Sequence, residues 1–295
     1  MNISKSVDTI LWPLIAILIY FVCQVLGQFV VQTSVFLSFP NGGEEQSLGR
    51  LAGWAQLVSS VVTVASMLLI RGFHIRRSLS LPSCGRGNVT LGFIAVILTL
   101  LSFTIFNDLL ETQLGWRMPP EYESLYREMM KTPSGVLAAC LFVPVCEEVV
   151  FRAGIMSPLL RHGVNPWIPI GLSAVIFGVF HGNLAQIAYA IPAGFVFAMV
   201  YYLTGSLLIS IVCHVLNNTV MVVLMLTTEN FSSFHIDSVM GVIPALCVAL
   251  LLSALVAYLL VGLWRKRSSS ARLYFLEVPA EVDSASFQVP PPPAV

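Results

Sequence analysis

Residues 136–156 read VLAACLFVPVCEEVVFRAGIM, an apolar run long enough to cross a membrane that carries Glu147 and Glu148 side by side. An ionisable side chain at bilayer depth costs about 3 kcal/mol by insertion scales, so it normally faces a protein interior and serves a function. Two histidines lie inside later apolar runs, His181 in VIFGVFHGN and His214 in IVCHVLNN. Together these groups predict a reaction centre inside a membrane protein.

The composition is that of a polytopic membrane protein. Of the 295 residues, 57% are hydrophobic and 10% are charged, whereas soluble proteins carry roughly 25% charged residues. The net charge is +0, so no global basic field would attract nucleic acid, and the expected surrounding is membrane lipid. Most of the six cysteines lie in apolar runs, which is no disulfide framework; Cys146 is either a nucleophile or, as is commoner for a buried cysteine, an apolar filler.

The fold is expected to be all-α, a polytopic membrane helical bundle of about eight transmembrane helices with a catalytic core of four. A span needs about 20 apolar residues. Such stretches lie near residues 10–38, 51–70, 89–109, 134–156, 167–182, 185–203, 206–227 and 240–264. The first begins like a signal peptide but has no small-residue cleavage site after it, so it is interpreted as an uncleaved span. The fifth and sixth are short and meet at Gly182-Asn183, so a tight helical hairpin is the alternative for them.

The chain divides into four expected parts. Residues 1–133 hold N-terminal transmembrane helices and loops, 134–227 the core with the polar motifs, 228–264 a C-terminal transmembrane helix, and 265–295 a disordered cytoplasmic tail with a proline-rich end. Residues 119–131 mix tyrosine, leucine and methionine with charges at helical spacing. This pattern predicts a short interfacial helix that is either a connector or a substrate gate.

Lysine and arginine set the expected orientation. Cations follow the second span and end the last one, whereas carboxylates fall on the opposite side: the cations are Arg71, Arg76, Arg77, Arg265, Lys266 and Arg267, and the carboxylates are Glu44, Glu45, Glu229 and Asp237. We therefore expect an integral multi-pass protein of the plasma or inner membrane with both termini cytoplasmic.

The polar residues of the core share one depth. Counted from the expected cytoplasmic helix ends at about 1.5 Å per residue, Glu147 lies roughly 14 Å into the membrane, His214 about 12 to 15 Å and His181 about 20 Å. Polar and aromatic residues also fall four apart, which places each pair on one helix face: Glu148 with Arg152, Phe177 with His181, and His214 with Asn218.

Glu147 points about 100° away from Glu148 on a helix, so the two carboxylates are expected to have different roles. Glu148 is expected to pair with Arg152, which neutralises both charges in a low dielectric. Glu147 then stays available as a general base toward a water molecule. His181 would orient that water or share its proton, and His214 with Asn218 would donate hydrogen bonds to the oxyanion of a tetrahedral intermediate, as peptide hydrolysis requires. The alternative for each residue alone is structural, and Phe177 is expected to pack.

The three motifs EExxxR, FxxxH and HxxxN, at Glu147 to Arg152, Phe177 to His181 and His214 to Asn218, resemble those of the CAAX protease and bacteriocin-processing family of intramembrane proteases, also called the ABI family. The resemblance covers residues 134–227. It implies an all-helical core with a cavity open to the cytosolic side, in which Glu147 activates water, His181 assists and His214 with Asn218 forms the oxyanion site. It also implies a membrane-associated or lipidated protein or peptide as substrate, as in the removal of the last three residues after a prenylated cysteine.

Two questions stay open at this level. No cofactor is expected, but Glu147, His181 and His214 would supply a three-ligand zinc site if the chemistry were metal-dependent, although the chain lacks an HExxH helix. A proton-coupled transporter is a rival function, because intramembrane glutamates and histidines also form proton relays, but no inverted repeat is found. A non-catalytic immunity or scaffold protein with the same cavity is the third.

Overall fold

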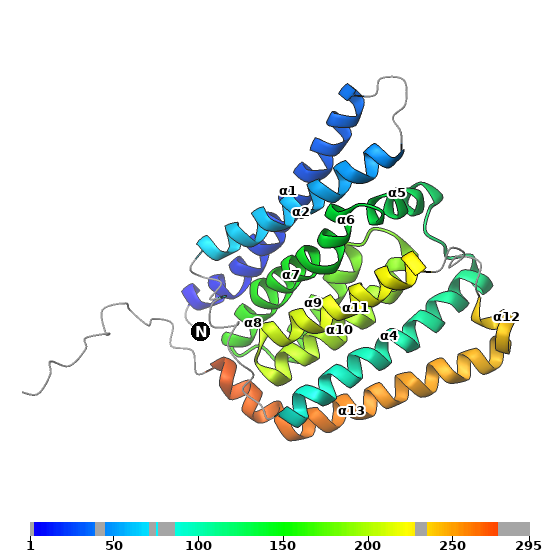
Figure 1. The fold of residues 1–295 in the computed structure, drawn as a ribbon. Coiled ribbons are helices and arrows are strands. Elements are labelled where there is room, and N and C mark those ends of the chain that lie inside the picture. Colours follow the sequence, from blue (N-terminus) through cyan, green and yellow to red (C-terminus); the bar gives the residue numbers. More distant parts are fainter. Residues whose placement is uncertain (1–2, 39–44, 71–74, 76–85, 228–234, 277–295) are drawn as a thin grey trace, which may run out of the picture.

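The structure is a computed structural model that describes residues 3–38, 45–70, 75, 86–227 and 235–276. Within these ranges the chain folds into helices and has no strand (Figure 1). In the same ranges seven helices are long and apolar enough to cross a membrane, and one further apolar helix, Trp167–Val179, is shorter. The predicted all-α membrane bundle is confirmed, and the fifth predicted span is the short helix.

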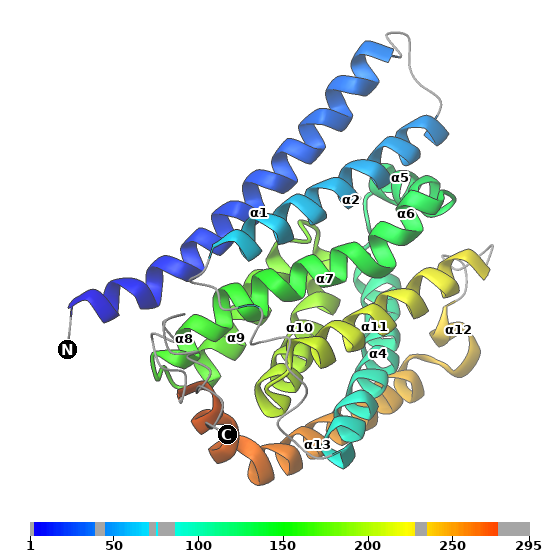
Figure 2. The ribbon, with the colours of Figure 1, turned by 60° about the vertical axis from the view of Figure 1, so that its left-hand side comes forward.

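Two long helices form one side of the molecule. α1 (Ile3–Ser38) and α2 (Glu45–Leu69) run side by side in opposite directions (Figures 1 and 2). Their close approach depends on a small residue, because a Cβ atom at Gly27 of α1 would meet the Cβ of Ser59 at 3.2 Å. The other side is formed by α4 (Arg86–Leu114) and α13 (Val242–Leu276), with the short α12 (Ile236–Met240) before α13.

The central span, Pro133–Arg161, is a helix of changing pitch. Thr132 starts it by accepting a hydrogen bond from the Gly135 amide at 3.1 Å, with a proline in the first turn. The span continues through α6 (Pro133–Leu137), the π-helical η2 (Ala138–Phe142), α7 (Val143–Glu148), the π-helical η3 (Val149–Met156) and α8 (Ser157–Arg161). π-helical segments are rare and occur frequently at functional sites, and these two flank the element that ends in Glu147 and Glu148.

The helical hairpin that was the alternative for residues 167–203 is what the structure forms. α9 (Trp167–Val179) has 13 residues, which is about 20 Å at 1.5 Å per residue and too short to cross the hydrocarbon. Gly182 then turns the chain with φ 75°, and Asn183 caps α10 (Leu184–Thr204) by accepting a hydrogen bond from the Gln186 amide at 2.9 Å. α11 (Leu207–Thr227) follows after a second turn. The short α9 thus ends, with His181 just beyond it, at membrane depth.

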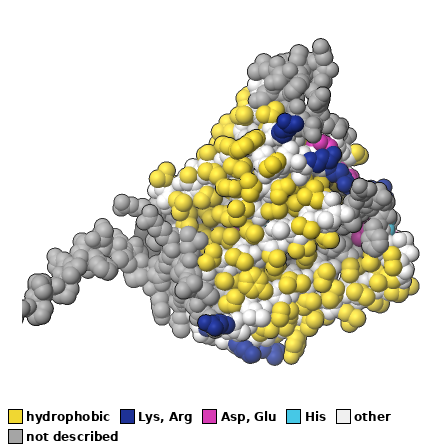
Figure 3. All heavy atoms as spheres, in the orientation of Figure 1, with side chains coloured by type: hydrophobic (Ala, Val, Ile, Leu, Met, Phe, Trp, Pro, Cys, Tyr) yellow, Lys and Arg dark blue, Asp and Glu magenta, His cyan; other side chains and the backbone are white. Residues whose placement is uncertain are grey.

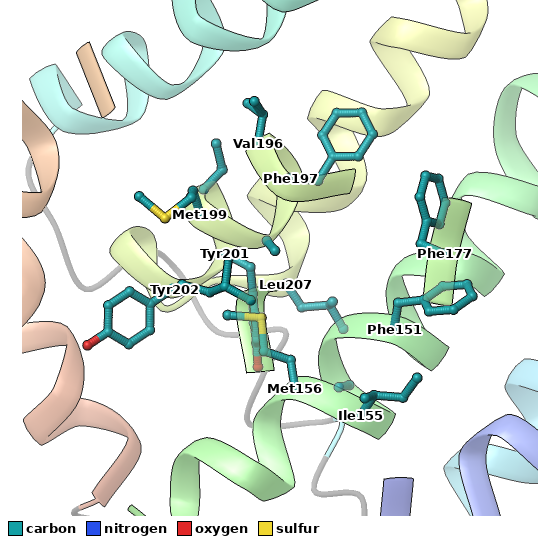
Figure 4. Packing of buried hydrophobic residues seen from close by; sticks show 14 of the residues in the cluster. Phe151, Ile155, Met156, Phe177, Val196, Phe197, Met199, Tyr201, Tyr202 and Leu207 are labelled. Carbon is teal, nitrogen blue, oxygen red and sulfur yellow. The ribbon is translucent and has the colours of Figure 1, made fainter. Parts of the chain in front are cut away.

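Large buried side chains hold these helices together. Phe151 of η3 and Phe177 of α9 meet edge to face with ring centroids 5.3 Å apart, and α10 contributes Phe197, Tyr201 and Tyr202 to the same cluster (Figure 4). Each of these five side chains is at most 3% exposed. The backbone that carries the polar motifs is therefore fixed by packing on several sides.

The bundle has two ends, which we name by their elements. The terminal end holds the start of α1, the described end of α13 and the end of α8, whereas the α5 end holds α5 (Pro120–Met130) and α12 (Figures 1 and 2). The α5 helix confirms the short helix predicted at residues 119–131. On the face that Figure 3 shows, the surface between the ends is mostly apolar, with basic side chains near the bend of α13 and mixed charges near α5.

The C-terminal helix is longer than expected. α13 continues to Leu276, so the prediction of a disordered tail from residue 265 is wrong for residues 265–276. The helix continues because it still buries apolar side chains there: Phe275 is 3% exposed and stacks on Tyr202 with ring centroids 5.9 Å apart. Several residues used in the sequence argument lie outside the described residues, namely Glu44, Arg71, Arg76, Arg77, Glu229 and the proline-rich end.

Candidate active site

Glu148 is a buried, fully paired carboxylate. Arg152 donates from Nε to Oε2 at 3.0 Å and from Nη2 to Oε1 at 3.3 Å, and both side chains are 0% exposed. The predicted pairing is confirmed. Because each charge of a buried pair depends on the other, the two residues hold the helix turn at the junction of α7 and η3.

Two serines complete this ion pair, and the sequence argument missed both. Ser210 of α11 donates to Glu148 Oε2 at 2.6 Å, and Ser173 of α9 accepts from Arg152 Nη1 at 2.6 Å while donating to the Phe151 carbonyl at 3.0 Å. The positions of the two serines in the sequence could have identified them. Ser173 lies four residues before Phe177, and Ser210 lies four residues before His214, so each motif face extends one turn further toward the N-terminus of its helix.

Glu147 has a different environment. It is 7% exposed and lines a cavity, and it accepts a hydrogen bond at Oε1 from the Tyr20 hydroxyl of α1 at 3.2 Å. Its other oxygen, Oε2, lies 3.6 Å from His214 Nε2. Among the described residues, no arginine or lysine pairs with Glu147 in the way that Arg152 pairs with Glu148. Glu147 is therefore the carboxylate that reaches the cavity.

His214 connects the two carboxylates. Its Nδ1 lies 3.0 Å from Glu148 Oε1, and its Nε2 faces Glu147. A carboxylate held by an arginine carries no proton, so Nδ1 donates, and Nε2 either accepts a proton from the Glu147 side or carries one as imidazolium. His214 thus lies between Glu148 and Glu147. Its expected role as an oxyanion donor stays a prediction.

The remaining motif residues also converge on this region. Phe177 packs against both histidine rings, with centroid distances of 5.0 Å to His181 and 5.5 Å to His214, which confirms its packing role. His181 lies in the turn just after α9, places Nδ1 3.0 Å from the Phe177 carbonyl and lines the cavity. Asn218 also lines the cavity and donates one amide hydrogen to the Ala139 carbonyl at 3.1 Å, so its second amide hydrogen is available.

Cys146 does not share this position. Its side chain is 0% exposed and belongs to the hydrophobic cluster. Although it precedes Glu147 in the sequence, it does not line the cavity. These contacts fit an apolar filler and not a nucleophile.

The cavity runs from Glu147 to the α5 end. It has a volume of about 530 Å³. Its walls come from the second half of α1, the first half of α2, α5, the central span, the end of α9, much of α10 and the middle of α11; Tyr126 of α5 and Tyr189 of α10 are among the lining residues. Burial raises the pKa of Tyr126 to about 12, so this hydroxyl stays neutral. The start of α1 and the described end of α13 lie at the opposite end of the bundle from α5.

The zinc alternative requires Glu147, His181 and His214 around one ion. Both imidazoles direct Nδ1 to an oxygen, which is the orientation of zinc-binding histidines, so the donor types fit. The spacing does not. Among the residues that the structure describes, no three His, Cys, Asp or Glu side chains are grouped so that they could hold a metal ion.

Comparison with known proteins agrees with this geometry. Residues 130–220 match the family model for type II CAAX prenyl endopeptidase Rce1-like proteins. The part of the chain that carries the three motifs is therefore similar to the CAAX prenyl endopeptidases. The matched region contains every predicted site residue, from Glu147 to Asn218, whereas Tyr20 lies outside it.

Two curated relatives carry the names of membrane peptidases. The chain is 30% identical over 94 residues to YdiL of Bacillus subtilis, which is named as a membrane peptidase, and this match covers 32% of the chain and 38% of YdiL. It is 25% identical over 231 residues to the membrane-embedded CAAX protease MroQ of Staphylococcus aureus, which covers 74% of the chain and 91% of MroQ. No solved structure matches the chain. The longer match shows that similarity to a CAAX protease extends well beyond the motif region.

Proposed function

We propose that the protein is an intramembrane endopeptidase that hydrolyses a peptide bond in a membrane-associated or lipidated protein or peptide. The observation that carries this proposal is the difference in surroundings between two adjacent carboxylates. Glu148 is neutralised by Arg152, whereas Glu147 lines a cavity large enough for a peptide segment. The names of the relatives support the same reaction class.

In the proposed reaction Glu147 removes a proton from water as the water oxygen attacks the carbonyl carbon of the scissile bond. Tyr20 fixes one carboxylate oxygen, and His214 Nε2 shares the proton at the other. The second amide hydrogen of Asn218 stabilises the oxyanion, and His181 positions the water. Glu147 or His214 then returns the proton to the leaving amine as the C–N bond breaks. This chemistry uses no metal, and the chelation experiment in the Discussion tests that part.

We also propose that the terminal end is cytoplasmic, so that the cavity opens to the opposite side of the membrane. The distribution of charge supports this orientation. Cations gather at the terminal end: Arg86, Arg161, Arg265, Lys266, Arg267 and Arg272. The α5 end has mixed charges instead, because Arg117, Arg127 and Lys131 pair there with Glu111, Glu123 and Glu128, and Asp108 and Asp237 add negative charge. Positive loops stay in the cytoplasm. The substrate would then present its scissile bond from the extracytoplasmic side.

The activity is tested with purified protein in lipid nanodiscs and two sets of fluorogenic peptides, one farnesylated at a C-terminal CAAX sequence and one with an unlipidated apolar anchor. We expect cleavage by the wild type and none by Glu147→Gln. Binding of peptide without cleavage by the wild type would support a scaffold or immunity protein instead. Substrate-driven proton flux in proteoliposomes without cleavage would support the transporter.

The orientation is tested separately with single cysteines and a membrane-impermeant maleimide applied to intact cells. Tyr122→Cys, at a side chain that is 63% exposed near the cavity, should be labelled from outside, and Arg272→Cys only after lysis. Cys84 and Cys247 are first replaced by serine to remove background. The reverse labelling pattern would place the cavity on the cytosolic side, as the family resemblance implied.

A further inference from the structure

α1 carries a polar face that the motifs do not explain. Gln24, Gln28 and Gln32 follow Tyr20 at intervals of four residues in an otherwise apolar span, and all four residues line the cavity. A spacing of four places them on one side of the helix. We refer to Gln24, Gln28 and Gln32 as the glutamine face. It leads along α1 toward the α5 end from Tyr20, which is bonded to Glu147.

The amides of this face are not used for structure. Within the described part of the chain, no hydrogen bond is formed by the side chains of Gln24, Gln28 or Gln32. The opposite wall differs, because its amides bond to each other and to the backbone. Asn183 donates to Gln186 Oε1 at 2.5 Å, and Tyr189 donates to Asn217 Oδ1 at 2.6 Å. The glutamine face is therefore free to bind something that enters the cavity.

The spacing of the glutamines matches an extended peptide. Four residues of α-helix advance about 6 Å, and two residues of an extended chain advance about 6.6 Å. Successive glutamines along α1 would therefore meet every second residue of a peptide lying beside the helix, on the same edge of that peptide. From Gln24 to Gln32 the distance is about 12 Å, which corresponds to roughly four extended residues.

We propose that the glutamine face binds the main chain of the substrate as an extended segment and feeds it to Glu147, an inference that rests on the proposed endopeptidase activity. Each primary amide has both a donor and an acceptor, so it can pair with a peptide C=O and N–H together. Such pairing would satisfy backbone groups of an extended chain wherever the helices shield that chain from water. Recognition is then by backbone and tolerates varied side chains over about four residues.

The test is a comparison of Gln28→Met with Leu26→Met in the same helix. Methionine keeps the length of glutamine and removes its hydrogen bonds, and Leu26 is a lipid-facing residue that is 57% exposed and does not line the cavity. We expect Gln28→Met to raise KM for a peptide of eight or more residues about fivefold, as one lost neutral hydrogen bond does, with kcat changed less than twofold. Leu26→Met should change neither value.

A scan of N-methylated substrates identifies the bonds. Methylation of a backbone nitrogen that pairs with Gln28 should raise KM for the wild type and add nothing in Gln28→Met, and such positions should alternate along the peptide. Peptide affinity is also measured in the Glu147→Gln background, where no turnover is needed, so that a failed activity and a failed binding face give different results. Unchanged affinity in Gln24→Met, Gln28→Met and Gln32→Met alike, or N-methyl effects that add fully to the substitutions, would overturn the proposal.

Discussion

Glu147 and Glu148 are neighbours in the chain, yet their surroundings are opposite. Glu148 points away from the cavity into the packed helices, which we call the dry side, and there Arg152, Ser210 and His214 all bond to its carboxylate. Glu147 points into the cavity, which we call the wet side, and has one hydroxyl donor and one more distant imidazole. Two adjacent residues of a helix can have such different surroundings because their side chains point about 100° apart.

Contacts on the dry side also position the imidazole that faces Glu147 on the wet side. His214 is held by Glu148 through Nδ1, which leaves Nε2 fixed toward Glu147. Phe177 packs against both His214 and Arg152, and the guanidinium carbon of Arg152 lies 5.5 Å from the centroid of the phenyl ring. A substitution on the dry side should therefore lower stability first, and a substitution on the wet side should lower activity first. The predictions below test that separation.

The largest effect is expected for Glu147→Gln. Removing the general base should lower kcat by about 10⁴-fold, the upper range for general base catalysis and about 5 kcal/mol in activation free energy. Glutamine has nearly the same shape, so the unfolding midpoint in detergent should stay within about 2 °C. Peptide turnover and thermal unfolding are measured on the same preparation. Cleavage at wild-type rate by the purified variant would show that Glu147 is not the base.

On the dry side, Arg152→Ala should destabilise the protein by about 3 to 5 kcal/mol, because it leaves Glu148 as a buried unpaired charge. The free energy of unfolding is measured by SDS titration in mixed micelles. The double variant Glu148→Gln with Arg152→Gln removes both charges and should recover part of the loss. If Arg152→Ala unfolds like the wild type, the pair does not stabilise the bundle.

Ser210→Ala should cost about 1.5 to 3 kcal/mol of stability, the range for a hydrogen bond to a charged group. The matched control is Ser238→Ala, at an exposed serine of α12 that bonds only to the local His235 carbonyl at 2.6 Å, and it should stay within about 0.5 kcal/mol. Equal effects at the two serines in the same SDS titration would mean that Glu148 does not depend on Ser210.

Tyr20→Phe should lower kcat about tenfold and leave stability within about 1 kcal/mol. The lost hydrogen bond to Glu147 is 3.2 Å long, so its contribution is at the low end for a charged acceptor. Tyr258→Phe is the control, because that tyrosine lies on α13 and is 75% exposed. A change in KM with kcat unaltered would move Tyr20 from the reacting carboxylate to substrate binding.

Local spacing explains what the sequence predicted well. Glu148 and Arg152 lie on one turn, and His214 and Asn218 lie on another, so their faces follow from helical geometry alone. Tyr20 could not be found in this way, because it reaches Glu147 across 127 residues of chain and belongs to a helix without a motif. The side on which the cavity opens was also beyond local spacing, since it depends on which halves of α1, α2 and α10 line it.

Helix ends were predicted less well for a physical reason. Apolar content marks residues 167–182 as a span, but the proline-bounded start at Trp167 and the turn at Gly182 leave only a short α9. In the same way, polar residues after Lys266 suggested a tail, yet packing of Phe275 against Tyr202 extends α13 to Leu276. A local glycine turn thus follows the end of α9, whereas a tertiary contact extends α13 past the local pattern.

The smallest effect is expected from metal removal. If Glu147 acts with Tyr20 and His214 as proposed, exhaustive chelation should leave kcat within twofold, and elemental analysis of active protein should find well under one transition metal per chain. A zinc site built from Glu147, His181 and His214 would instead lose turnover on chelation and regain it with added zinc. The variant His214→Gln also distinguishes the metal-free reaction from the zinc site. Glutamine can keep a hydrogen bond to Glu148 and partial activity, whereas a zinc ligand generally cannot be replaced by glutamine. Stoichiometric zinc that switches activity off and on would reassign His214 from proton sharing to metal binding, and the contrast between Glu147 and Glu148 would then be one between a metal ligand and the ion pair that positions it.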